Sequence, residues 1–435
     1  MEILSPGRKI KMLRNKIGLR QDQLTDDKIT RSLISMIENG KRSLNQKTAL
    51  IIAEKLNLYY KNIGKEITLE YLLEKEEQQA EKIINDLIKT LQPFLLDKKD
   101  IDDLHVTDLF NKAISLSNDW KLDCKLAEVL NVRGVYNLEF ENYNDALMDF
   151  FNSVEFYLKE KNYSKIVDLY IKIAKCYLML DMTIQAVFFC DKAYAMADTY
   201  KTSKHDETLV IAICNKIISF KRANKYDHSL KSINQLKGIR GVREDIMDWA
   251  LYMEAASLLC LKNYDKSIKL LEKLLNKENR LNSKVRAFTF MKVACYYIEK
   301  GNRDSALSFL NDSKDIINNL KYDEKAEALL ELSEEYFKLE EINKALDALD
   351  EGINLNGFYF KSEIFIDMNI LYSRIYMSLQ NYDLAINFLK EAEALALKKY
   401  NIIRLKKIYC YFGDIFSKLK EYEACEEYFK KIRNI

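Results

Sequence analysis

Small side chains return at a nearly constant interval in the apolar helical pattern that fills the chain from about residue 101 onward. The first series comprises Ala146, Ala186, Ser229, Ser267, Ala306, Ala345, Ala385 and Cys425, spaced 38 to 43 residues apart. The second series, twelve residues earlier, comprises Gly134, Ala174, Ala255, Ala294, Ser333, Ser373 and Gly413. A repeat of this length predicts stacked helical hairpins, because a single hairpin cannot bury its own apolar face.

Aromatic residues follow the second series by three positions, at Tyr177, Phe220, Tyr297, Tyr336, Tyr376 and Phe416. We interpret most Tyr and Phe side chains here as packing residues that fill the space beside the small ones. The pattern resembles the tetratricopeptide repeat, with a period nearer 40 than 34. The expected fold is all-α. Residues 101–435 form a right-handed superhelix of about eight tetratricopeptide-like hairpins, and Ile101–Ser117 is an additional helix at its start.

The first 66 residues follow a different pattern, in which four short helices with apolar positions alternate with polar turns, the fourth marked by Ile52, Ala53 and Leu56. The first helix is expected over Pro6–Ile17, and Gln21 opens the second. Thr30 is a suitable N-cap for the third, whose buried face holds Ile34 and Ile37 three residues apart. Gly40 suits the left-handed position that ends such a helix.

Residues 20–42, RQDQLTDDKITRSLISMIENGKR, resemble the helix-turn-helix of the Cro/repressor (Xre) family. The resemblance implies that the third helix enters the DNA major groove. Base edges would be read by Arg31, Ser32, Ser35 and Met36, with phosphates contacted by Gln21 and the Asn39–Lys41 loop. The expected DNA-binding set is Gln21, Thr30, Arg31, Ser32, Ser35, Met36, Asn39, Lys41 and Arg42.

The same resemblance assigns Arg14 and Glu38 to a structural salt bridge. The stretch between Leu24 and Ile34 is one residue shorter than usual and lacks the turn glycine, so the turn geometry stays open. Asp26 and Asp27 place negative charge near the DNA side. The alternative to DNA binding is a helix-turn-helix that has become a protein-binding module.

Charge separates this head from the rest of the chain. Residues 1–66 hold 14 Lys and Arg against 7 Asp and Glu, a charge of +7, whereas the remaining residues hold 54 against 59, a charge of −5. A basic head on a slightly acidic body points to a polyanion as the partner of the head alone.

A connector is expected over residues 67–100, as one helix that is capped by Thr68 and stops at Pro93. Its apolar stripe from Ala80 to Leu91 must pack on the repeats or on a second subunit. The run Glu74–Gln79, EKEEQQ, is interpreted as a solvated hinge.

No motif for catalysis or metal binding stands out in the sequence. The eight cysteines are at least 14 residues apart, and they never converge with the three histidines at ligand spacing. No Gly-rich phosphate loop and no GxSxG motif is present. We therefore expect no enzyme activity and no cofactor. The absence of an apolar leader and of a bilayer-length stretch predicts a cytoplasmic protein without membrane contact.

The architecture as a whole, an Xre-type head followed by helical repeats, resembles the RRNPP family of bacterial regulators that sense short signalling peptides. MEILSPGRKIKML and ITRSLISMIENGKR look closest to clostridial RstA-type regulators of toxin production and sporulation. The resemblance implies a homodimer that binds double-stranded DNA and a quorum-sensing peptide. The repeat phase places the candidate peptide-binding residues on the concave wall or at its edge: Asn131, Lys175, Asn215, Tyr252, Met291, Lys292 and Arg374.

Two alternatives remain open at this stage. Any one of these polar residues can simply belong to a solvated groove face. The repeats can also serve as an adaptor for a protein partner, such as a sporulation kinase or response regulator. A narrow, Asn-lined groove favours a peptide, whereas a broad acidic or apolar convex patch favours a protein.

Overall fold

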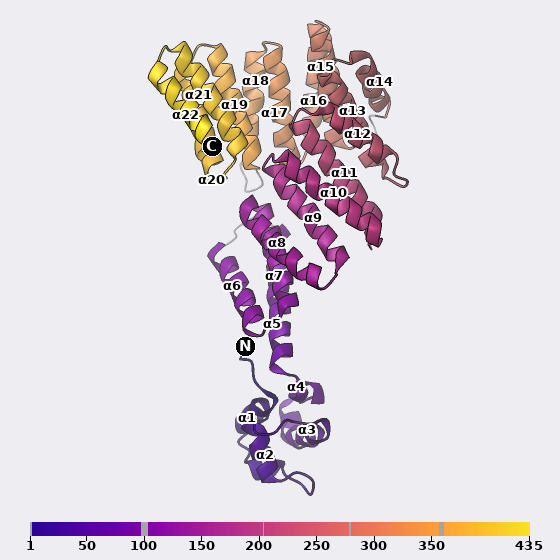
Figure 1. The fold of residues 1–435 in the computed structure, drawn as a ribbon, viewed down its shortest axis with the longest axis vertical. Coiled ribbons are helices and arrows are strands. Elements are labelled where there is room, and N and C mark those ends of the chain that lie inside the picture. Colours follow the sequence, from indigo (N-terminus) through magenta and orange to yellow (C-terminus); the bar gives the residue numbers. More distant parts are fainter. Residues whose placement is uncertain (1, 97–102, 203, 278–279, 356–360) are drawn as a thin grey trace. The chain divides into compact units, whose positions relative to one another are not determined.

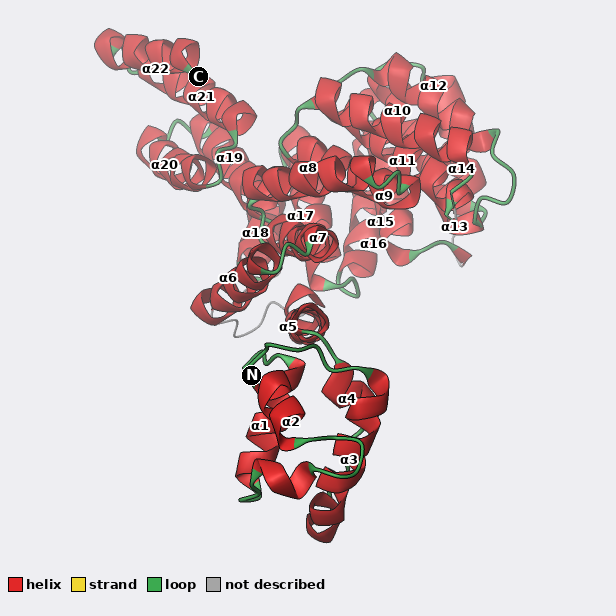
Figure 2. Cartoon of the chain, turned by 60° about the horizontal axis from the view of Figure 1, so that its bottom comes forward, coloured by secondary structure: helices red, strands yellow, loops and turns green. Residues whose placement is uncertain are grey.

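Helices make up all the numbered elements of the described residues, as Figures 1 and 2 show. The structure is a computed structural model that describes residues 2–96, 103–202, 204–277, 280–355 and 361–435. It comprises two compact units, Met1–Val132 and Arg133–Ile435. The expected start of the additional helix at Ile101, and the predicted boundary at residues 100 and 101, lie outside the described residues.

The first unit begins with the helix-turn-helix. Its elements are α1 (Pro6–Lys16), η1 (Gln21–Leu24), α2 (Arg31–Glu38), α3 (Gln46–Tyr60), η2 (Lys61–Ile63), α4 (Leu69–Leu73), α5 (Glu76–Leu96) and α6 (Asp103–Asp119); α7 (Asp123–Glu139) extends into the second unit. Ile10, Leu24, Ile34, Ile52 and Leu56 are fully buried in one apolar core. The predicted inward positions therefore build the core that orients α2.

Gly7 allows α1 to approach α2 more closely than any other residue type would permit. A Cβ atom at this position would lie 2.0 Å from the backbone oxygen of Ile37. Because real Cβ atoms do not approach so closely, a larger residue here would push α1 away from the end of α2.

The connector differs from the single helix predicted from the sequence. Thr68 caps α4 as expected, since its hydroxyl accepts from Tyr71 N at 3.2 Å, but α4 ends at Leu73 and α5 begins only at Glu76. Pro93 does not end α5; it lies inside it. A proline inside a helix removes one backbone hydrogen bond, and α5 nevertheless continues through Pro93 to Leu96.

The apolar stripe of α5 is buried within the first unit. Ala80, Ile84 and Leu91 are 0 to 1% exposed, and α5 packs against α6, where Phe110 and Ala113 are equally buried. The stripe is therefore covered within this chain, and no second subunit is needed to bury it. This removes the reason for which the sequence suggested it as a dimer surface.

The second unit consists of stacked helical hairpins, as predicted. With α7 as the first helix, the described residues form eight hairpins. The remaining helices are α8 (Tyr143–Lys159), α9 (Tyr163–Met179), α10 (Thr183–Tyr200), α11 (His205–Arg222), α12 (Tyr226–Lys237), α13 (Glu244–Cys260), α14 (Tyr264–Leu275), α15 (Ser283–Glu299), α16 (Arg303–Ile317), α17 (Tyr322–Lys338), α18 (Ile342–Ile353), α19 (Ser362–Ser378), α20 (Tyr382–Lys398), α21 (Ile402–Lys418) and α22 (Tyr422–Asn434). Each hairpin packs against the next along the chain (Figure 1).

The small residues twelve positions apart meet across each hairpin. The Ser267 hydroxyl donates to Ala255 O at 2.8 Å, and the Ser333 hydroxyl donates to Ala345 O at 2.7 Å. Contacts of this length require both helices to carry small side chains. The predicted pairing of the two series is therefore the point of closest helix approach.

Aromatic stacking accompanies the same crossings. Tyr177 stacks on Phe189 with ring centroids 5.7 Å apart, and Tyr297 stacks on Phe309 at 5.6 Å. Tyr376 and Phe388, and Phe416 and Tyr428, repeat the arrangement at 5.6 Å. Each pair is again twelve residues apart, so one ring on either helix fills the gap beside the small residues.

Most hairpin turns adopt a left-handed backbone without using glycine. Glu141, Lys161 and Asp181 have φ values of 61°, 54° and 57°. A side chain in this conformation costs roughly 1 kcal/mol relative to glycine. A non-glycine residue at the turn provides a side chain, and the side chains of Glu141 and Asp181 form the contacts described below.

Candidate nucleic-acid interface and ligand cavity

The third helix of the head, α2, presents one buried and one open face. Thr30 caps it as predicted, accepting from Leu33 N at 3.2 Å. Ile34 and Ile37 are buried, whereas Arg31 and Ser32 are exposed. Ser35, Met36, Asn39, Lys41 and Arg42 are half-buried or exposed. The predicted base-reading residues thus share the solvent side of α2 and the loop after it.

The shortened turn before α2 is closed by a side chain rather than by glycine. Asp26 Oδ1 accepts from Lys28 N and Ile29 N, both at 2.8 Å, and Asp26 and Ile29 form an isolated bridge. A carboxylate that binds backbone N–H groups two and three residues later replaces the turn that glycine normally allows. The second helix of the motif is consequently reduced to one 3₁₀ turn, η1.

Behind α2, Arg14 and Glu38 form the structural ion pair that the sequence predicted. Arg14 Nε lies 2.7 Å from Glu38 Oε1, and Arg14 Nη2 donates to Glu38 Oε2 at 3.0 Å. The hydrogen bonds that Arg14 donates to Glu38 raise the pKa of Arg14 despite burial. Gln21, predicted to contact phosphate, donates its amide to Glu38 Oε2 at 2.8 Å and so braces this pair. A phosphate contact by Gln21 would have to use its remaining polar atoms.

The loop after α2 is ordered by backbone hydrogen bonds. Gly40 has a φ of 71°, as predicted for the end of this helix, and Lys41 N donates to Met36 O at 2.8 Å. The Asn39 side-chain amide donates to Ser35 O at 2.8 Å, so part of the hydrogen-bonding capacity of Asn39 is already used within the head. Lys41 and Arg42 extend from this fixed loop as exposed cations.

A buried lysine, which sequence reasoning missed, fixes the head to the start of the connector. Lys9 is 1% exposed, and its Nζ lies 2.8 Å from Tyr71 O and 2.9 Å from Glu74 Oε2. Glu74 also lies 2.6 Å from Lys82 Nζ. Burial raises the pKa of Glu74, but the hydrogen bonds from Lys82 and Lys9 outweigh it and leave that pKa lowered. The interpretation of this segment as a solvated hinge is therefore wrong at Glu74.

The second unit contains a cavity, lined by many charged residues, between hairpins that are far apart in the sequence. It measures about 690 Å³ and is lined by residues of the turn after α9 and of α11, α17, α19 and α21. A smaller space of about 250 Å³ adjoins it, since Glu327, Leu330, Asp367 and Lys407 line both. The walls come mainly from the first helices of the hairpins, which are the helices expected to face inward. A volume of this size falls within the roughly 300–1,000 Å³ of ligand sites.

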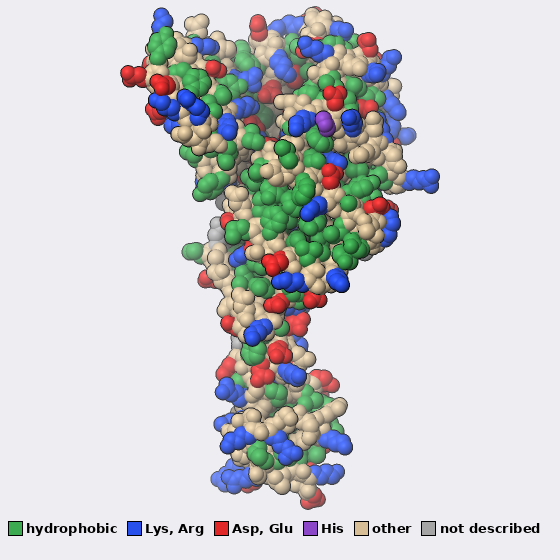
Figure 3. Space-filling view, in the orientation of Figure 1, with side chains coloured by type: hydrophobic (Ala, Val, Ile, Leu, Met, Phe, Trp, Pro, Cys, Tyr) green, Lys and Arg blue, Asp and Glu red, His purple; other side chains and the backbone are tan. Residues whose placement is uncertain are grey.

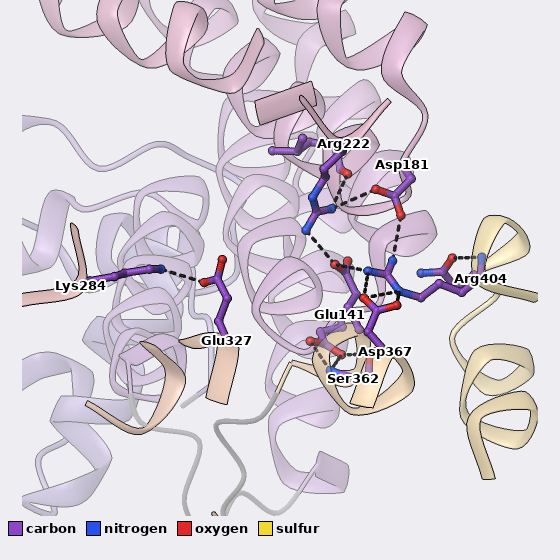
Figure 4. A network of polar contacts seen from close by, with 11 residues as sticks. Glu141, Asp181, Arg222, Lys284, Glu327, Ser362, Asp367 and Arg404 are labelled. Carbon is purple, nitrogen blue, oxygen red and sulfur yellow. Dashed lines mark hydrogen bonds and ion pairs between the residues drawn. The ribbon is translucent and has the colours of Figure 1, made fainter. Parts of the chain in front are cut away.

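Five residues form an ion-pair cluster, here called the closure cluster, in the wall of the larger cavity. Its members are Asp181, Arg222, Glu363, Asp367 and Arg404. Arg222 lies 3.1 Å from Asp181 and 3.0 Å from Glu363. Arg404 lies 2.8 Å from both Asp181 and Asp367, and 3.5 Å from Glu363. Figure 4 shows the two guanidinium groups pointing towards the carboxylates between them.

Burial sets the electrostatics of this cluster. Glu363 is 3% exposed, and burial raises its pKa although Arg222 and Arg404 act to lower it. Burial acts to lower the pKa of Arg404, but Asp367 and Glu363 outweigh it, so that pKa is raised. The guanidinium groups therefore stay charged and hold the two sides of the cavity together.

The predicted peptide-binding residues fall into three groups. Lys292 and Arg374 line the smaller space together. Lys175 is exposed and lies 3.7 Å from Glu139, while Asn131 and Asn215 are half-buried; none of the three lines either cavity.

Tyr252 and Met291 lie in the apolar core, 5% and 0% exposed. Their side chains cannot reach a groove ligand without rearrangement, because the repeat phase at these positions points between helices. The sequence also missed the closure cluster, since its members come from helix ends and turns up to 223 residues apart. The sequence feature that could have indicated this cluster is the presence of charged residues at the ends of the first helices of the hairpins.

Two further findings concern the described residues only. They contain no group of three or more His, Cys, Asp and Glu side chains able to hold a metal ion. None of their helices combines the length and the apolar character that a membrane crossing needs.

Similar helical architectures occur among solved structures. A Rap protein complexed with competence and sporulation factor is 13% identical, with a TM-score of 0.46, and the match covers 99% of this chain and 98% of that chain. The apo form of the quorum sensor NprR from B. thuringiensis is 16% identical, with a TM-score of 0.48, over 88% and 92%. The apo form of RapI is 12% identical, with a TM-score of 0.39, over 71% and 96%. At these sequence identities and TM-scores, a function can be argued only from the residues of this chain.

Sequence families identify the two parts directly. No curated protein matches the chain. Residues 10–60 match the helix-turn-helix family, and residues 366–399, which cover most of α19 and α20, match the tetratricopeptide repeat. The chain therefore joins a helix-turn-helix DNA-binding domain to a tetratricopeptide-repeat domain.

Proposed function

We propose that this protein is a transcriptional regulator whose repeat domain binds a short signalling peptide and thereby changes the affinity of the head for DNA. The observation that supports DNA binding most directly is the open face of α2. Arg31 and Ser32 stand exposed at its start, on a helix whose other side is anchored in the core. The loop after it adds Lys41 and Arg42, which suits phosphate contact.

Peptide binding is supported by the cavity in the repeat domain. An extended peptide would lie along the two adjoining spaces, against walls that alternate carboxylates with lysine and arginine side chains. The walls are densely charged rather than Asn-lined, so recognition would depend on ion pairs more than on amide clamps. A ligand that prefers one curvature of the repeats would shift the DNA affinity by linkage, about 5- to 150-fold for a coupling of 1–3 kcal/mol.

The biological setting we propose is the control of toxin production and sporulation in response to cell density. Its support is the resemblance of MEILSPGRKIKML and ITRSLISMIENGKR to RstA-type regulators. A homodimer is part of the proposal, because two heads on a palindromic site double the contacts made by one.

Footprinting on the DNA upstream of the protein's own gene, with and without short secreted peptides encoded nearby, tests the proposed function. We expect a protected site whose two halves are related by a dyad, and a shift in the protein concentration that gives half protection when the active peptide is added. Absence of any protected site would contradict DNA regulation. A protected site that ignores every peptide would contradict the sensing step alone.

A second candidate function is an adaptor that binds a protein through its convex surface. Figure 3 shows hydrophobic side chains gathered over α8, α9 and α10. Met148, Ile184 and Phe188 are 66%, 76% and 51% exposed, which is unusual for large apolar residues in neighbouring hairpins. Ile184→Lys separates the two functions: loss of a captured protein partner with unchanged DNA binding would favour the adaptor.

A further inference from the structure

The closure cluster joins parts of the repeat domain that are separated by most of its length. Arg222 and Glu363 are 141 residues apart, and Arg404 and Asp181 are 223 residues apart. Two more contacts run beside it. Glu141 accepts from Ser362 N at 3.0 Å and from the Ser362 hydroxyl (Figure 4). Lys399 Nζ donates to Phe140 O at 2.9 Å.

Negative charge is in excess within the cluster. Three carboxylates, from Asp181, Glu363 and Asp367, face the two guanidinium groups of Arg222 and Arg404. Glu363 accepts Arg222 through Oε2 only, and its buried Oε1 has no hydrogen-bond partner among the described residues. A buried carboxylate oxygen without a donor is costly, so the site is incomplete as it stands.

The same carboxylates border the cavity. All five cluster residues line the larger space, and Asp367, which is 26% exposed at its side chain, lines the smaller one as well. Lys361 and Lys407 also line the larger space, but they are exposed and form no ion pair with another described residue. They are free to turn outward or towards a ligand carboxylate, and they leave the deeper negative charge uncompensated.

From these contacts we propose that the cavity takes a ligand carrying a guanidinium or ammonium group, which binds at Asp367 and Glu363 where the two ends of the repeat domain meet. In the proposed function this ligand is a peptide with an arginine or lysine side chain, and the inference rests on that function. The ligand cation shares Asp367 with Arg404 and lies beside Glu363 in the cavity wall. Because those carboxylates also hold the hairpins together, binding changes the strength of the closure.

The test uses the full chain and a synthetic library of randomised pentapeptides, from which retained peptides are identified by mass spectrometry. We expect retained peptides to be enriched in Arg and Lys at least about tenfold, the effect of one charge-assisted hydrogen bond. Glu363→Gln and Asp367→Asn should abolish that enrichment. Glu155→Gln is the matched control: Glu155 lines neither space, and its carboxylate is 71% exposed and pairs with Lys159 at 3.0 Å.

A second measurement needs no protein variant. The best retained peptide is resynthesised with citrulline, the neutral isostere, in place of arginine, and calorimetry should show binding about tenfold weaker or more. Retained peptides without a cationic preference, or equal affinity for the citrulline peptide, would overturn the subsite while leaving peptide sensing intact. If no peptide is retained, the subsite is overturned and peptide sensing fails with it, whereas DNA binding is judged separately by footprinting.

Discussion

Lys9 Nζ lies 2.9 Å from Glu74 Oε2, and this contact joins the first helix of the DNA-binding head to the segment that leads into α5. Both side chains are removed from solvent, at 2% and 11% exposure, and Lys9 also donates to two backbone oxygens. The head is therefore fixed to its connector by a buried lysine whose ammonium group has three acceptors, and not by a solvated linker.

Replacing Lys9 with Met should destabilise the head by about 3 kcal/mol, because Glu74 would keep only its bond to Lys82. Hydrogen exchange of α1 amides in the full chain measures this. Lys61→Met is the control, since the Lys61–Glu66 pair is two-thirds exposed and 3.6 Å long. Equal protection in both variants would contradict the structural role of Lys9.

The same contact predicts a dependence on pH. The pKa of Glu74 is lowered in the folded head, so its contribution to stability is present above the ordinary carboxyl value. That contribution is lost as the pH falls from about 4 through the lower folded value. Protection of α1 amides should fall over this range in the wild type, and should fall less in Glu74→Gln.

Replacing Arg31 with Ala should cost about 1–3 kcal/mol on the specific site and relax sequence preference, as expected for a residue that reads a base. Lys41→Ala should weaken all DNA sequences alike and reduce the salt dependence. Fluorescence anisotropy with specific and scrambled duplexes at several salt concentrations distinguishes the two. Lys65→Ala, an exposed cation beyond α3, serves as the control.

Replacing Asp26 with Ala should destabilise the head by about 1–2 kcal/mol, because two backbone N–H groups lose their acceptor. Asp26→Asn keeps the oxygen and should be near neutral. The neighbouring Asp27 is exposed and makes no such bond in the described residues, so Asp27→Ala is the matched control. Amide hydrogen exchange in α2 of the full chain measures the difference in stability between these variants. If Asp27→Ala were destabilised and Asp26→Ala were unchanged, the role of Asp26 in closing the turn would be contradicted.

Replacing Arg404 with Met should cost about 3–5 kcal/mol, since it leaves the largely buried Asp367 carboxylate without its ion-pair partner and leaves Asp181 with Arg222 alone. Hydrogen exchange should rise in residues 140–143 and 361–367, on both sides of the closure. Lys159→Met removes an ion pair that is 71% exposed on each side and should change neither segment. A local effect confined to α21 would argue against closure.

Sedimentation at micromolar concentration should give about twice the 51.1 kDa of one chain. Since the stripe of α5 is buried within the chain, substitutions there should unfold the connector rather than release monomers. Phe188→Asp tests the exposed apolar patch instead. A monomeric wild type bound to one half-site would contradict the dimer.

Local patterns predicted the fold well because each hairpin contacts mainly its neighbours. The pairs Ser267–Ala255 and Tyr177–Phe189 are twelve residues apart, so a regular sequence spacing reports their contact directly. Met291 shows the limit of that reasoning. A shift of one position in the repeat phase moves a side chain from the groove to the core, and nothing in the local pattern reveals it.

Long-range polar contacts could not be predicted in the same way. Lys9 meets Glu74 across 65 residues, and Arg404 meets Asp181 across 223. Neither pair follows a periodicity, because the positions depend on how helix ends and turns are arranged in space. The candidate DNA face of α2 lies within one helix and its caps, so the Thr30 cap and the exposure of Arg31 and Ser32 could be predicted from the sequence, whereas the cavity could not.

The closure cluster also bears on how the repeat domain unfolds. An open array of repeats behaves as a one-dimensional chain, in which end hairpins fray first and unfolding spreads inward in steps. Here the turns at Glu141 and Asp181 are bonded to α19 and α21, so hairpins near either end hold each other in place. Fraying at one end must then break contacts at the other. The domain should accordingly melt in a single cooperative transition, and Arg404→Met should divide that transition into two.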